Sequence, residues 1–160
     1  MSNVRFLMHL VAQFSFVAIA LLSPPLGQAA GTPFTGSWSI DLRTPAERDR
    51  KAECGIATVT LTQSADKITG DHSMATADCG RVNDGGEGTV KGVVVGTVAV
   101  VVVTSARNGG VAMGTAKLER GALRWKMLEE IKPGEPEGDS PLILWEGLLA
   151  RQPNRVPAAK

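Results

Sequence analysis

Two cysteines, Cys54 and Cys79, are the first side chains in this 160-residue sequence whose chemistry can be assigned. An even pair of cysteines in an exported chain predicts a disulfide, and the apolar N-terminal segment predicts export. A zinc site would need further ligands, but only one histidine, His72, follows that segment. We therefore expect a structural disulfide and no metal site.

His72 is followed by Ser73, a pair that could suggest nucleophilic catalysis. Neighbouring residues on a strand point to opposite faces, so these two side chains cannot cooperate. The sequence has no Gly-x-Ser-x-Gly elbow, and we expect no catalytic residues, no enzymatic activity and no cofactor. His72 lies on the inward face of its expected strand. There its ring either forms hydrogen bonds with a neighbouring residue or lines a ligand site.

Residues 80–88 form a glycine-rich loop that could suggest a phosphate cradle. The loop lacks the Gly-Lys-Ser/Thr ending of a P-loop, contains two acidic residues, and precedes no expected helix. We interpret it as a turn at one end of the fold. There Arg81 and Asn83 could contact a ligand or a partner.

The acidic run at residues 135–139 contains Pro136 and follows Pro133. Calcium sites need several oxygen ligands around a compact turn, which these prolines disfavour. We expect a solvated loop.

The first 29 residues have the features of a signal peptide. One arginine precedes an apolar stretch, prolines follow it, and small residues stand at the expected cleavage site. A membrane anchor is the alternative, although the apolar stretch is marginal for a span. We expect a bacterial periplasmic or secreted protein with a domain at 30–151 and a flexible tail at 152–160.

Composition narrows the function further. The length suits one domain, and the formal net charge of +1 lacks the strong basic field of a general nucleic-acid binder. We expect no nucleic-acid partner, and no membrane contact once the leader is removed.

Most of the chain after the leader is predicted to form β-strands. Thr44, Pro45 and Glu47 predict a short capped helix after the first strand. Alternating apolar and polar residues predict eight strands, at 37–43, 57–62, 68–74, 88–95, 98–105, 111–118, 122–130 and 142–151. Short connections favour an all-β, eight-stranded antiparallel up-and-down barrel over a two-sheet sandwich.

The run from Val98 to Val103 is apolar on both faces of its expected strand. A barrel strand normally has one face exposed to solvent. Because this run is apolar on that face as well, it predicts a contact between copies of the chain.

The tripeptide Gly36-Ser37-Trp38 opens the first strand and resembles the G-x-W element of calycin-type barrels, which include lipocalins, avidins and small bacterial protease inhibitors. The resemblance implies that Trp38 packs across the closed end of the barrel. Ile40 and Leu42 stand where avidins place polar ligand contacts, which argues against biotin. The disulfide-bonded early hairpin is more similar to the protease-inhibitor barrels.

Inward positions combine small residues with tryptophans. The small ones either leave space for a ligand or mark tight coiling of the sheet. We therefore expect a non-catalytic barrel that binds a small, largely apolar molecule, with His72 and Trp125 among its contacts. The alternative is a periplasmic or secreted inhibitor of a protease or lytic enzyme, with a filled barrel.

Overall fold

The computed structural model describes residues 32–135 and 142–153. The expected signal peptide at 1–29 lies outside the described residues, as does most of the expected tail. Within the described part, no helix is long and apolar enough to cross a membrane.

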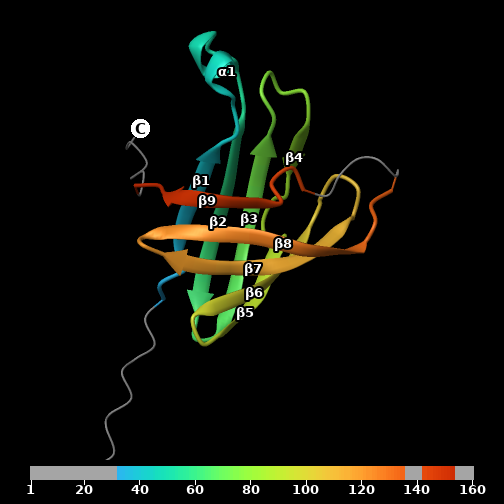
Figure 1. The fold of residues 1–160 in the computed structure, drawn as a ribbon. Coiled ribbons are helices and arrows are strands. Elements are labelled where there is room, and N and C mark those ends of the chain that lie inside the picture. Colours follow the sequence, from blue (N-terminus) through green and yellow to red (C-terminus); the bar gives the residue numbers. More distant parts are fainter. Residues whose placement is uncertain (1–31, 136–141, 154–160) are drawn as a thin grey trace, which may run out of the picture.

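Eight antiparallel strands close into a barrel, which confirms the expected fold class (Figure 1). Seven pairings follow the chain order, and the pairing of the first strand with the last closes the sheet. The strands of the barrel are β1 (Gly36–Asp41), β2 (Ile56–Ser64), β3 (Lys67–Ala75), β5 (Val90–Val95), β6 (Val98–Thr104), β7 (Val111–Glu119), β8 (Ala122–Lys132) and β9 (Glu146–Arg151).

Two details differ from the expected strands. The loop expected at 76–87 contains a short strand, β4 (Val82–Asp84), which pairs with the end of β3 and turns Asn83 into the protein. The last strand begins at Glu146 rather than at 142, because Leu142 and Leu144 turn into the core instead of continuing the ladder.

The short helix α1 (Pro45–Asp49) follows β1, with the expected capping box between Thr44 and Glu47. Figure 1 shows α1 and the β3–β4 turn projecting from the same end of the barrel. The predicted Cys54–Cys79 disulfide joins them, and Arg50 forms an ion pair with Asp78. We call these two joined segments, residues 44–55 and 76–81, the crest.

The core fills the barrel with apolar side chains from all eight of its strands, and both ends are covered. Trp38 and Trp125 are buried, as their inward positions predicted, whereas the third tryptophan, Trp145, is 38% exposed. Phe34 covers one end, and Leu142 and Leu144 belong to the same core at the other. Recognition therefore has to be sought at the ends and on the outer surface.

Three inward glycines show what the small residues do. A Cβ atom on Gly70, Gly92 or Gly114 would lie between 2.0 and 2.3 Å from a backbone carbonyl oxygen of the neighbouring strand. Such distances are far inside van der Waals contact. These glycines mark places where the sheet coils tightly. The sequence had left this interpretation open beside the alternative that small residues leave space for a ligand.

Candidate functional site

The structure brings together two of the residues selected from the sequence, His72 and Asn83. His72 Nε2 lies 2.9 Å from Asn83 Oδ1, and His72 Nδ1 lies 3.1 Å from Thr89 Oγ1. Asn83 Nδ2 donates to Ser105 Oγ at 3.3 Å. Both ring nitrogens of His72 therefore have protein partners.

The hydrogen bonds define the protonation state of His72. The amide oxygen of Asn83 can only accept, so neutral His72 carries its proton on Nε2. Its Nδ1 faces the Thr89 hydroxyl, whose single proton also reaches Gly86 O at 2.9 Å. Burial lowers the pKa of His72 below its ordinary value of 6.5. The Asn83 hydrogen bond and the carboxylates of Asp71 and Asp84 oppose that shift. His72 fastens β4 and the following loop to β3, since Gly85 N also donates to His72 O.

The other two selected residues lie elsewhere. Trp125, on β8, is fully buried, and its Nε1 has no hydrogen-bond partner among the described residues. Arg81 is exposed in the β3–β4 turn, where its backbone N donates to Thr76 Oγ1. His72 and Trp125 line none of the hollows described below.

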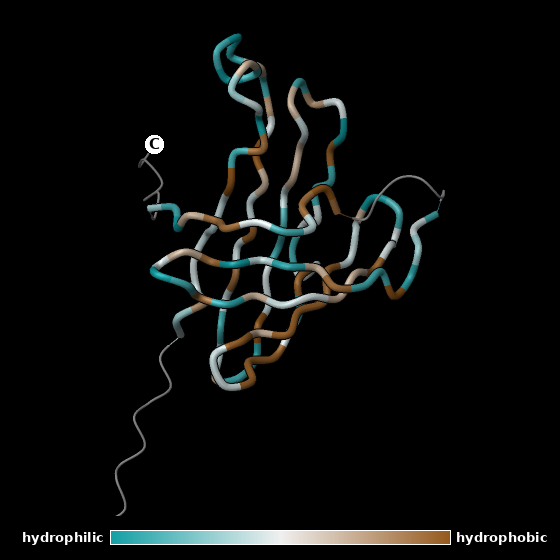
Figure 2. Tube along the Cα trace, in the orientation of Figure 1, coloured by the Kyte–Doolittle hydropathy of each residue, from teal (hydrophilic) through white to brown (hydrophobic). Residues whose placement is uncertain are grey.

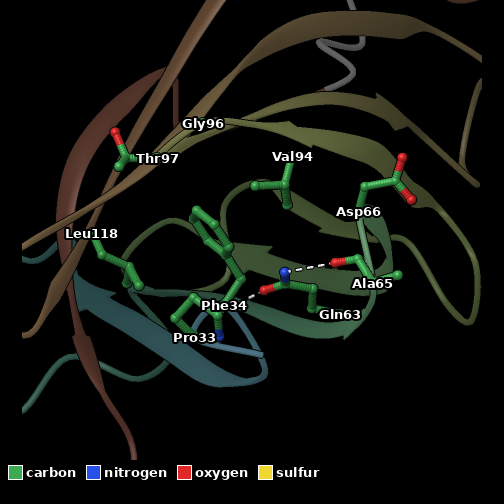
Figure 3. Close-up of a pocket in the computed structure, with 9 residues that line it drawn as sticks. All are labelled: Pro33, Phe34, Gln63, Ala65, Asp66, Val94, Gly96, Thr97 and Leu118. Atoms are coloured by element: carbon green, nitrogen blue, oxygen red, sulfur yellow. Dashed lines mark hydrogen bonds between the residues drawn. The ribbon is translucent and has the colours of Figure 1, made fainter. Parts of the chain in front are cut away.

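An apolar hollow of about 550 Å³ lies at the end of the barrel that Phe34 covers (Figure 3). We call it the Phe34 hollow. Its wall comes from the segment before β1, the β2–β3 turn, the β5–β6 turn and the end of β7. The described lining residues are Pro33, Phe34, Gln63, Ala65, Asp66, Val94, Gly96, Thr97 and Leu118.

Hydrogen bonds hold Phe34 firmly in place. Phe34 N donates to Gln63 Oε1 at 3.3 Å, and the indole Nε1 of Trp38 donates to Phe34 O at 3.0 Å. Gln63 Nε2 in turn donates to Ala65 O at 2.8 Å. Arg151 stacks over the Trp38 ring, 4.9 Å from its centroid. The floor of the hollow is thus preformed.

The chemistry of the Phe34 hollow is that of an apolar binding surface. Phe34, Val94 and Leu118 supply apolar carbon, and the amide of Gln63 is already engaged by the protein. Asp66 is the single charged side chain among the described lining residues. Within the described ranges, no three His, Cys, Asp or Glu side chains are grouped so that they could hold a metal ion.

The sequence did not predict this hollow. Phe34 precedes the first strand, in a segment for which the sequence predicted no element, and the other walls come from three distant turns and strand ends. The inward positions of Val94 and Leu118 near the ends of their strands were the available signal. Alternation alone does not reveal which strand ends meet.

Comparison with known proteins yields no match to a family model, a curated protein or a solved structure. The disulfide indicates an oxidising, extracytoplasmic compartment.

Proposed function

We propose that this protein is an exported, non-catalytic β-barrel that binds a small, largely apolar molecule in the Phe34 hollow. The observation that carries the proposal is the hollow itself. Its volume of about 550 Å³ falls in the range of small-molecule sites, and its walls are mainly apolar with few polar groups. Trp38 packs beneath it, which supports the resemblance to calycin-type barrels.

The site differs from the one the sequence suggested. His72 was expected to anchor a ligand, yet both of its ring nitrogens are engaged by Asn83 and Thr89. A ligand at the Phe34 hollow needs no such anchor. Burial of apolar area against Phe34, Val94 and Leu118 supplies its binding free energy, at roughly 25 cal/mol per Å² before the costs of association.

The test is a titration with the apolar fluorescent probe N-phenyl-1-naphthylamine. We expect saturable binding that Val94→Arg weakens by about tenfold or more, since a charge in the wall must be desolvated. Val93→Arg is the matched control, because Val93 lies next in the chain but faces outward and is 47% exposed. Absence of saturable binding, or equal losses in both variants, would contradict the proposal.

The filled interior favours a second candidate, a protein-binding barrel that inhibits a secreted protease or lytic enzyme. The crest is its natural contact surface, because the disulfide and the Arg50–Asp78 ion pair brace a projecting segment. A preorganised loop loses less conformational entropy on binding. Arg81 lies at the base of this crest and is exposed to a partner.

Inhibition assays against a panel of secreted serine, cysteine and metalloproteases and a muramidase test this candidate. We expect an inhibitor to lose potency when Arg81→Glu reverses a charge at the crest, while Arg120→Glu at the exposed β7–β8 turn leaves potency unchanged. A protein that inhibits no member of the panel gives this candidate no support.

A further inference from the structure

The outer face of β1, β2 and β3 carries a regular array of hydroxyl side chains. The strand register aligns Ser37 with Thr60, Ser39 with Thr58, and Thr62 with Thr69. Neighbours lie about 4.8 Å apart across strands and about 6.8 Å apart along them. We call this array the hydroxyl face: Ser37, Ser39, Thr58, Thr60, Thr62 and Thr69.

The hydroxyl face is recessed rather than flat. Two hollows of about 630 and 610 Å³ lie over it and share Thr60 and Thr62 in their walls. Ser37, Ser39, Thr58 and Thr60 are half-buried even though they alternate with the inward core residues of their strands. One wall is formed by Gln152 and Pro153 and the other by Glu87 and Gly88.

The hydroxyl groups are not used by the fold. In the part of the chain that the structure describes, none of the six hydroxyls forms a hydrogen bond with another protein group. Each can therefore donate one hydrogen bond and accept others from a ligand.

Charge limits what the ligand can be. Asp71 and Glu87 are the charged side chains among the described lining residues, and no lysine or arginine lines either hollow. Lys91 lies opposite Thr69 in the strand register, and Arg151 lines a smaller hollow that adjoins the first one. Within the two hollows themselves, an anionic polymer would meet the like charges of Asp71 and Glu87. A neutral molecule with many hydroxyls fits, because hydroxyls pair with hydroxyls and a carboxylate can accept from two vicinal hydroxyls.

We propose that the hydroxyl face is a binding site for a neutral glycan chain. It goes beyond the proposed function, because it involves a second surface and a different class of ligand. The two adjoining hollows extend over three strands, about 10 Å, so an oligosaccharide fits better than a single sugar. Asp71 and Glu87 act as acceptors at one end and the Gln152 amide at the other.

The experiment titrates the isotopically labelled mature protein with four neutral oligosaccharides, namely cellohexaose, maltohexaose, mannohexaose and fully N-acetylated chitohexaose, each to millimolar concentration. We expect at least one to shift the backbone amide signals of β1–β3 residues on this face. Thr60→Val removes one hydroxyl while keeping the shape and strand preference of the side chain, so we expect about five- to tenfold weaker binding.

Thr115→Val is the matched control, because Thr115 is also a half-buried threonine between two inward residues, but on β7. It should leave the affinity unchanged, as should Val94→Arg in the Phe34 hollow. The proposal is overturned if no oligosaccharide shifts these signals, if Thr60→Val binds like the wild type, or if Thr115→Val weakens binding equally. Equal binding of polygalacturonate would overturn the requirement for a neutral ligand.

Discussion

At the scale of single residues, His72 couples stability to pH. Its pKa in the folded protein lies below the ordinary 6.5, mainly because burial disfavours the charged ring. The native state therefore favours neutral His72. The resulting contribution to the free energy of unfolding is fully present above about pH 6.5. It is lost as pH falls from there towards the folded pKa.

We therefore expect the free energy of unfolding in urea to fall between about pH 7 and pH 5, where a histidine titrates. His72→Gln should flatten this pH dependence, whatever its effect on overall stability. An unchanged slope in the variant would show that His72 is not the group responsible.

The two buried tryptophans offer a matched comparison of one hydrogen bond. Trp38 Nε1 donates to Phe34 O, whereas Trp125 Nε1 has no partner among the described residues. Replacing either indole by phenyl removes similar volume. Only Trp38→Phe leaves a buried carbonyl without its donor, so it should cost about 1 kcal/mol more than Trp125→Phe. Equal costs in urea titrations would argue against the Trp38–Phe34 hydrogen bond.

Sequence patterns predicted which side chains point inward but not which partners they meet. The alternation of Ile68, His72 and Met74 placed all three correctly on the inner face. The partners of His72 come from β4 and from the residue before β5, and no local pattern encodes that meeting. The hydrogen-bond partners of a polar side chain inside a barrel come from distant parts of the chain. The sequence therefore selected His72 as a candidate but could not show whether it binds a ligand or supports the fold.

At the scale of elements, the disulfide should hold the crest together, whereas the barrel should still fold without it, with lower stability. The bridge closes a loop of 25 positions, which corresponds to about 3–4 kcal/mol of chain entropy. Replacing both cysteines by serine should lower the free energy of unfolding by about that amount and keep the β-sheet circular dichroism signal. Peptide mapping without reductant should find one Cys54–Cys79 link and no free thiol. Two free thiols in the exported protein would contradict the bridge.

Strand assignment succeeded where alternation was clear and failed where the chain leaves the ladder. Seven of the predicted strands differ from the observed bounds only at their ends, and the eighth begins four residues late. At Leu142 and Leu144 the sequence could not distinguish a strand from a segment that covers the end of the barrel, because apolar residues suit both structures. The sequence also could not show whether Gly70 leaves room for a ligand or allows the sheet to coil tightly. The answer depends on how closely the Thr60 carbonyl approaches Gly70.

At the scale of the whole molecule, the outer valines of β5 and β6 form an exposed apolar surface. Ala99, Val101 and Val103 face the core, whereas Val100 is 37% exposed beside Val93 of β5. Figure 2 shows the apolar character of this part of the barrel. We predict that copies of the chain associate through the strand from Val98 to Val103, because an exposed apolar patch gains free energy on burial.

Sedimentation velocity checks this prediction. The wild type should show a concentration-dependent dimer. Val100→Lys should abolish this dimer, whereas Thr62→Lys, on β2, should retain it. A monomer at all concentrations would show that these valines stay exposed in solution.

We propose above all that the Phe34 hollow holds an apolar small molecule. Native mass spectrometry of the protein purified from the periplasm or the culture medium of a bacterial host would reveal such a molecule. We expect a bound mass that is released on denaturation, is present in Val93→Arg, and is absent from Val94→Arg. The bare mass of the chain in the wild type, or a bound molecule retained equally by Val94→Arg, would contradict it.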